Sequence, residues 1–214
     1  MRIKAVILSS MMALGISHGY AQELSWDEKE TLRLRMEECV YDFLSYIPEI
    51  AGKKNKSYEE QQLAQKYITK ALGLFIGRGE DYEYLDQAGN KRLHQAVKVQ
   101  TKRGHEYTQG MPIKRYLERL MHLPYQQISI DTWYGFRMDS LVHDLGEGLY
   151  IASGTMVFYS YSKVEDKYIQ SAENSVKTSL YVKREEYEIG PHGDRITIWS
   201  SGKLGDLKIS TRWK

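Results

Sequence analysis

The sequence predicts an α+β fold in which N-terminal helices pack on a curved antiparallel sheet of about four long strands. Apolar residues recur at helical spacing in the first part of the chain, and the period changes to two from Tyr125 onward. Helices first and strands afterwards is the α+β order. We see no internal repeat and no domain-sized linker, so residues 22–214 are expected to form a single domain.

Capping boxes predict where the two long helices begin. Residues 25–28 (Ser-Trp-Asp-Glu) place Glu three positions after an N-cap Ser, and an apolar stripe follows, with Pro48 and Gly52 expected to end this helix. Residues 57–60 (Ser-Tyr-Glu-Glu) repeat the pattern and open a second helix. Gly77 and Gly79 are expected to stop that second helix. The helices therefore occupy residues 22–79.

The middle of the chain carries weaker signals. Residues 80–110 are polar and are predicted to form a loop region with one short strand at 96–100. Residues 111–214 are predicted to hold a short helix, which begins at Pro112, and then the antiparallel sheet. Gly154 interrupts the longest β-rich run and is expected to mark a bulge.

The N-terminus is typical of a secretory signal peptide. Arg2 and Lys4 precede an apolar stretch at residues 5–16, and small residues follow before the expected cleavage site after Ala21. The apolar stretch is too short to span a membrane, which takes about 20 apolar residues. An uncleaved anchor or a buried first helix are the alternatives. We expect a bacterial periplasmic or secreted protein whose mature chain has no membrane span.

Charge argues against a nucleic-acid partner. The chain has 30 Lys and Arg against 28 Asp and Glu, and residues 1–21 hold two of the basic residues, so the mature chain balances at 28 of each sign. A dedicated nucleic-acid binder needs a basic stripe. The one basic cluster, at residues 53–56, is better explained as a solvated loop.

Cysteine and histidine content bounds the chemistry. Cys39 is the only cysteine, so stability must come from a core, and its place on the first helix predicts a buried thiol rather than a nucleophile. An exported chain without disulfides fits a bacterial periplasm. The histidines are scattered without metal-ligand spacing, so we expect no metal site and no cofactor.

Four segments in order carry a family resemblance: residues 71–80 (ALGLFIGRGE), 112–120 (PIKRYLERL), 154–159 (GTMVFY) and 199–207, from Trp199 through Leu-Gly-Asp-Leu. With them the chain resembles the NTF2-like, cystatin-like α+β cone, and more narrowly a group of exported Bacteroides-type proteins of unknown function. The resemblance implies a fold and a compartment. It implies no catalytic residue, because the group has no established activity and no enzyme site of the related cones can be matched here.

Asp131, Tyr134 and His143 belong to the densest run of titratable residues and are the catalytic candidates. A Tyr hydroxyl and a carboxylate of raised pKa could transfer protons inside a cone. The same run lies at a strand end and its turn, where Asp and Gly occur for backbone reasons. We therefore assign no catalytic residue.

Aromatic residues predict an interaction surface on the outer face of the sheet. The chain has 17 Tyr, and Tyr is common at interfaces. Residues expected to face the helices are Phe158, Leu180, Val182, Ile196 and Ile198. Period two then places on the opposite face Tyr159, Tyr161, Tyr181 and Trp199. A solvated sheet face is the alternative, because Tyr also has good strand propensity.

Two function classes follow. The first is a non-catalytic periplasmic binding or protein-interaction module, with a protein partner or a second copy bound through the outer sheet face. The alternative is a small NTF2-like enzyme that acts by acid–base chemistry on an apolar small molecule held in the cone. A closed apolar interior favours the first class, and an open pocket with two converging titratable groups favours the second.

Export gives the first testable prediction. Because residues 1–21 have the basic, apolar and small-residue regions of a signal peptide, we expect the mature chain to begin at Gln22. Intact-mass measurement on periplasmic material checks this. A full-length chain found in the cytoplasm would contradict it.

Overall fold

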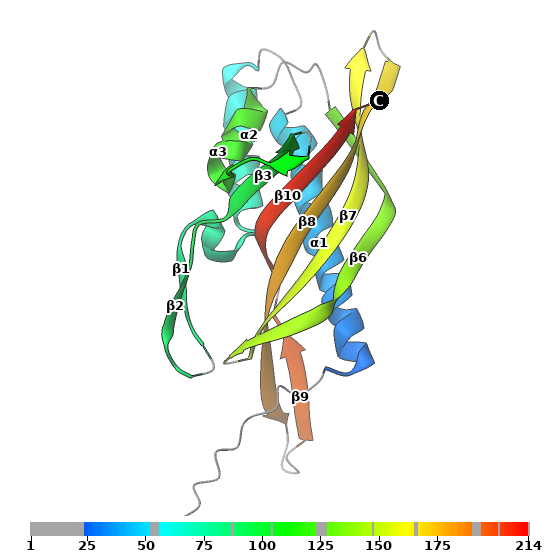
Figure 1. Cartoon of the computed structure of the whole chain (residues 1–214). Coiled ribbons are helices and arrows are strands. Elements are labelled where there is room, and N and C mark those ends of the chain that lie inside the picture. The colour runs from blue at the N-terminus through cyan, green and yellow to red at the C-terminus, as the bar shows by residue number, and fades with distance from the viewer. Residues whose placement is uncertain are drawn as a thin grey trace, which may run out of the picture.

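The computed structural model in Figure 1 describes residues 24–51, 56–86, 88–103, 105–122, 128–146, 148–164, 167–189, 194–200 and 202–213. The predicted signal peptide and its cleavage site lie outside these residues. The helices are α1 (Trp26–Ala51), α2 (Tyr58–Leu72), the 3-10 turn η1 (Ile76–Gly79) and α3 (Ile113–Met121). The strands are β1 (Tyr82–Leu85), β2 (Lys91–His94), β3 (Lys98–Arg103), β4 (Glu106–Tyr107), β5 (Met111–Pro112), β6 (Ile128–Gly146), β7 (Leu149–Val164), β8 (Lys167–Ile189), β9 (Asp194–Trp199) and β10 (Lys203–Trp213).

The α+β class is confirmed, but the sheet differs from the one predicted. Among the described residues there are ten strands instead of about four. Eight of them form the main sheet, in the order β4-β3-β10-β8-β7-β6, with β5 on β3 and β9 on β8, while β1 and β2 form a separate hairpin. The sheet is mixed instead of antiparallel, because β10 pairs with β3 in parallel. Residues 80–110, predicted to be a loop region with one short strand at 96–100, contain β1 to β4, and β3 overlaps the predicted strand.

Helix α1 begins as predicted, passes the first of the two residues expected to end it, Pro48, and ends just before the second, Gly52. The Ser25 amide donates to Glu28 Oε2 at 2.9 Å and the Glu28 amide donates to Ser25 Oγ at 3.2 Å, which is the capping box. The helix continues through Pro48 to Ala51. Ile50 and Ala51 are fully buried, so burial of the last turn outweighs the hydrogen bond that proline cannot donate.

Helix α2 ends before the glycines that were expected to stop it. Its capping box at Ser57 is present, but the helix closes at Leu72 with Gly73 as its C-cap. The predicted stop at Gly79 instead falls in η1, where the backbone is left-handed, with φ of 84° at Gly79. A Cβ at this position would overlap the Ile113 side chain, so glycine is required for the close approach of α3.

Lys56 joins two helix ends. Its ammonium donates to the carbonyl of Ile50 at 2.7 Å and to the carbonyl of Met121 at 3.2 Å, and it thereby caps the C-termini of α1 and α3. Partial burial lowers the pKa of Lys56. This member of the basic cluster predicted to be a solvated loop is thus a structural contact.

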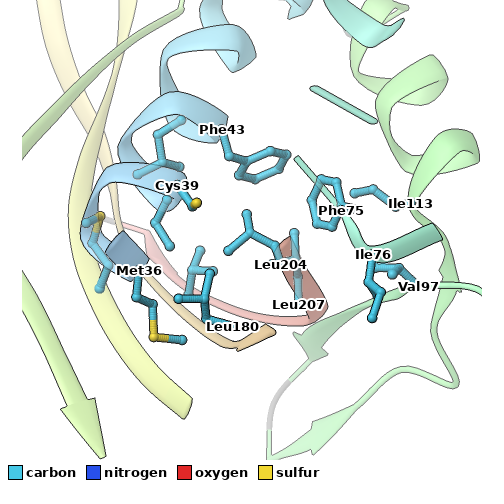
Figure 2. Packing of buried hydrophobic residues seen from close by; sticks show 14 of the residues in the cluster. Met36, Cys39, Phe43, Phe75, Ile76, Val97, Ile113, Leu180, Leu204 and Leu207 are labelled. Carbon is cyan, nitrogen blue, oxygen red and sulfur yellow. The ribbon is translucent and has the colours of Figure 1, made fainter. Parts of the chain in front are cut away.

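The core lies between α1 and the inner face of the sheet (Figures 1 and 2). β7 and β8 pair without a shift from Leu149–Lys183 to Ser160–Ala172, so one alternating set of side chains on both strands faces α1. Fully buried side chains from the helices and β10 include Leu32, Met36, Ile68, Ile113, Leu117, Leu204 and Leu207, and those from β7 and β8 include Met156 and Leu180.

Gly154 marks a close approach of a side chain and not the bulge expected from the sequence. It pairs with Thr178 in the unbroken β7–β8 register and with Met138 on β6. A Cβ at position 154 would overlap the ring of Phe136, which is buried over the strand at this point. The irregularities lie in the neighbouring strand β6, whose register with β7 shifts on both sides of this pair.

This packing gives a stability prediction. Gly154→Ala is expected to lower the free energy of unfolding by about 1–3 kcal/mol, because the new methyl group overpacks against Phe136. Denaturant unfolding measures it. Phe136→Leu combined with Gly154→Ala should recover part of the loss, and Thr155→Ala on the outer face serves as the matched control. A fully stable Gly154→Ala variant would show that the ring does not lie there.

Candidate interaction surface

The outer face of the sheet is built from the odd-numbered residues of β7 and β8, since the even-numbered residues from 150 to 158 and from 172 to 182 are buried. Tyr159 and Tyr161 belong to this odd-numbered set and are half-buried. Tyr159 pairs with Glu173 on one side and with Asp131 on the other, so it stands in the middle of three strands. These two tyrosines are partly available to solvent.

Tyr181 also belongs to the odd-numbered set, but the β1–β2 hairpin covers it. The His94 ring lies 5.1 Å from the Tyr181 ring, edge to face. The Tyr181 ring also packs against Gly205, where a Cβ atom would lie only 2.8 Å from Tyr181 Cε2. Burial, assisted by the Asp206 carboxylate, raises the pKa of Tyr181 to about 12. Tyr181 is therefore a buried packing residue, and its ring is not part of an open surface.

Trp199 lies on the side opposite to the one predicted. Its ring contacts Tyr150, 5.5 Å away between centroids, and the Arg184 guanidinium, 6.0 Å from the centroid. Arg184 in turn bonds Glu28 at the start of α1 at 3.1 Å and Glu186 at 3.2 Å. Trp199 thus continues the inner, α1-facing side of the sheet and helps to hold β9 against the body of the protein.

The two isoleucines of β9 also lie on the face opposite to the one predicted. They were predicted to face the helices, but Ile196 is 40% exposed and Ile198 is 47% exposed. The register between β8 and β9 explains the difference. Arg184 lies on the same side of β8 as buried Val182 and pairs with Trp199, so Trp199 faces inward. The next pair joins Glu185 to Ile198, so Ile198 faces outward. A displacement of one residue moves every side chain of a strand to the other face.

The end of β8 and the whole of β9 form a two-stranded ribbon that extends beyond the rest of the sheet, as Figure 1 shows below the body. We call residues 184–189 and 194–199 the β8–β9 ribbon. Strand β7 begins at Leu149, opposite Lys183, so among the described strands only β9 pairs with this part of β8. The Arg184 amide donates to the Gly148 carbonyl at 2.7 Å, and beyond it the ribbon has two edges that no described strand covers.

Among its described side chains, the outer face of the ribbon is apolar except for Glu185, whose carboxylate is paired. Tyr187 pairs with Ile196 and is 47% exposed, so with Ile198 it forms an exposed apolar surface. The Tyr187 hydroxyl donates to Glu185 at 2.6 Å, and the Lys183 ammonium lies 3.4 Å from the same carboxylate. These contacts lower the pKa of Glu185 and keep it ionised and paired.

The three catalytic candidates are spread along one strand. Asp131, Tyr134 and His143 all lie on β6, where they pair with Tyr159, Val157 and Ile151 of β7. At about 3.3 Å per residue, the span from Tyr134 to His143 is of the order of 30 Å. Asp131 is half-buried, and the side chains of Tyr134 and His143 lie outside the described ones. Along the strand, His143 is therefore far from the other two candidates.

Cys39 is buried, as predicted. Its thiol donates to the Gly202 carbonyl at 3.4 Å, and burial raises its pKa to about 11. A thiol that stays protonated at neutral pH is a poor nucleophile. Cys39 packs α1 against the segment before β10.

The described residues provide neither a metal site nor a membrane-spanning helix. In the part of the chain that the structure describes, no three His, Cys, Asp or Glu side chains gather as a metal ion would require. His94 packs on Tyr181, and His105 and His122 are exposed, while the side chains of His143 and His192 are not described. Within the same residues, no helix has the length and apolarity to cross a bilayer.

Sequence reasoning missed Tyr187, Ile196 and Ile198 as surface residues. Ile196 and Ile198 are two residues apart on one strand, so period two shows that these two share a face, whereas Tyr187 lies on the strand before the turn. Period two could not show which face, because the turn at 190–193 sets the register between the two strands. The pairing of Arg184 with Trp199 supplies that information.

Comparison with known proteins adds no identification. The sequence matches no model of a protein family and no curated protein. The function has to be inferred from the chemistry of the chain itself.

The reversed faces give a prediction about stability. Tyr181→Ser and Trp199→Gln are each expected to lower the free energy of unfolding by about 2–4 kcal/mol, because both remove packed aromatic rings. Ile198→Ser, on the exposed face, should change it by no more than about 0.5 kcal/mol. Thermal or denaturant unfolding separates the two groups. Equal losses for Ile198→Ser and Trp199→Gln would contradict the assignment of these two side chains to opposite faces of β9.

Proposed function

We propose that this chain is a non-catalytic interaction module that binds a protein partner through the outer face of the β8–β9 ribbon. The observation that carries the proposal is the exposed apolar surface of Tyr187, Ile196 and Ile198 on a ribbon that leaves the body of the sheet. Exposed apolar groups gathered on one face are characteristic of partner surfaces. Aromatic residues are also enriched at such surfaces.

The nature of the interior supports a binding role over catalysis. Figure 2 shows Met36, Phe43, Phe75, Leu180 and Leu204 pointing into the space between α1 and the sheet. The Phe43 and Phe75 rings are 5.3 Å apart, edge to face. The enzyme alternative requires two titratable groups to converge on an open pocket in this space, and its three candidates are spread along β6.

The proposal includes the compartment and the family suggested by the sequence. Export to the periplasm is supported by the signal-like residues 1–21 and by the absence of a second cysteine in the chain. Relation to the NTF2-like cones is supported by the order of two helices, a short helix and long strands. Within this proposal the half-buried Tyr159 and Tyr161 belong to the same outer face as the ribbon.

Site-specific photocross-linking in the native cell tests the binding surface. A photoreactive phenylalanine analogue in place of Ile198 is expected to yield a discrete protein adduct of fixed mass, because this side chain is exposed on the proposed surface. The same analogue in place of Leu34, which is 53% exposed on α1, is the matched control and should yield none.

The outcome is read by denaturing electrophoresis and mass spectrometry. No adduct at Ile198, or the same adducts at Ile198 and Leu34, would contradict the proposed function. Unfolding curves of both labelled chains should match that of the unlabelled chain, since both positions are exposed.

A further inference from the structure

The open edges of the sheet differ in how readily they could accept another strand. Strand β6 at one end is irregular, because its register with β7 shifts at four places, and bulges of this kind hinder edge pairing. At the other end β4 and β5 are two residues long. Strand β9 pairs with β8 over six residues without a shift, and no described strand lies on its other side. It is a regular, open edge.

The backbone groups on that edge can be identified. The Ser200 amide donates to the Lys183 carbonyl at 2.8 Å, which makes Lys183 and Ser200 a hydrogen-bonded position of the antiparallel ladder. Such positions alternate along a strand, so Ile198 and Ile196 bond to β8. The amide and carbonyl groups of the residues between and beside them, Thr197 among them, point away from β8.

We infer that β9 pairs edge to edge and antiparallel with β9 of a second copy of this chain, about a two-fold axis at Thr197. The inference rests on the proposed function and names its partner. In this arrangement Thr197 lies opposite Thr197 of the second copy, and Arg195 lies opposite Trp199. These are the residues whose backbone groups point outward, so three hydrogen-bonded pairs form across the axis.

Side chains match in the same register. Ile196 lies opposite Ile198 of the second copy, and the reverse pair forms on the other side of the axis, so the exposed isoleucines meet on one face. β-branched pairs and Thr–Thr pairs across strands are favourable contacts. An axis moved to Ile196 would place Asp194 opposite Ile198 and form one hydrogen-bonded pair fewer.

Charge distinguishes β9 from the other open edge of the ribbon. The open part of the β8 edge, from 185 to 189, carries three acids, Glu185, Glu186 and Glu188, and no base, so two copies joined there would bring acidic residues together. Strand β9 carries one acid and one base, Asp194 and Arg195. Around the axis at Thr197 neither lies opposite a like charge, because Asp194 meets Ser200. The pairing is also isologous, so it closes as a dimer.

A cysteine at the axis tests the geometry. Hydrogen-bonded partners in an antiparallel pair have Cα atoms about 5.5 Å apart, within the range of about 4.4–6.8 Å that a disulfide spans. Under mild oxidation Thr197→Cys in the full chain should therefore form a covalent dimer. Glu186→Cys is the matched control, because Glu186 pairs with Thr197 in the same ribbon. In the dimer the two Glu186 residues are separated by three inter-strand spacings, about 14 Å, so the Glu186→Cys chain should form no covalent dimer.

Substitution at the axis tests the association itself. Thr197→Pro removes an amide that points away from β8, so it should raise the dissociation constant of the dimer about tenfold or more and leave the ribbon paired. Thr197→Val keeps the amide and should associate as the natural chain does. Sedimentation velocity gives the masses, and unfolding curves show whether the proline variant keeps its fold.

A second pair of variants keeps the test decisive if proline weakens the ribbon. Ile196→Lys with Ile198→Lys, and Ile196→Glu with Ile198→Glu, should each be monomeric alone and should dimerise when mixed, because opposite charges then meet across the axis. A natural chain that is monomeric at micromolar concentration, or a mixture that fails to associate, overturns the inference. A cross-linked adduct of Ile198 with a different protein and a monomeric chain would overturn it and leave the proposed function standing.

Discussion

The apolar stripe of α1 and the inner face of the sheet leave water only by packing against each other, and most of the remaining structure follows from that burial. Met36 and Phe43 on α1 meet Leu180 and Leu204 on the sheet, all of them buried almost completely. Burial holds α1 in a helix past Pro48 and requires β7 and β8 to keep one unbroken register over this region. A slip of one residue would expose the whole inner set of side chains.

That register extends beyond the core into the β8–β9 ribbon. Because Val182 faces α1, Arg184 lies on the same side and its partner Trp199 is drawn toward Tyr150 and the start of the helix. The Arg184–Glu28 contact at 3.1 Å then joins the base of the ribbon to α1. Because neighbouring side chains of a strand point to opposite faces, Ile196 and Ile198 lie on the outer face. The exposed isoleucines are therefore a consequence of the core register and of the length of the ribbon.

Much of the fold could be predicted from local patterns. The sequence predicted correctly both capping boxes, the long strands and the buried Cys39, because each depends on neighbours in sequence. Of the short strands between 80 and 110, β3 overlaps the strand predicted at 96–100, whereas β1, β2 and β4 were missed, because strands of two to four mostly polar residues have no clear periodicity. Gly154 was misread because the ring that fills its space comes from the neighbouring strand.

The sequence by itself determined the order of helices and strands, the helix starts and which side chains of a strand share a face, because these depend on spacing along one segment. Tertiary structure decided which face is covered. Tyr181 is aromatic and Ile198 is β-branched, and each lies in a strand whose side chains alternate between the two faces. The β1–β2 hairpin nevertheless buries Tyr181, whereas nothing described covers Ile198. The physical reason is that burial depends on the partner strand and its register, and these are set by contacts between residues far apart in the chain.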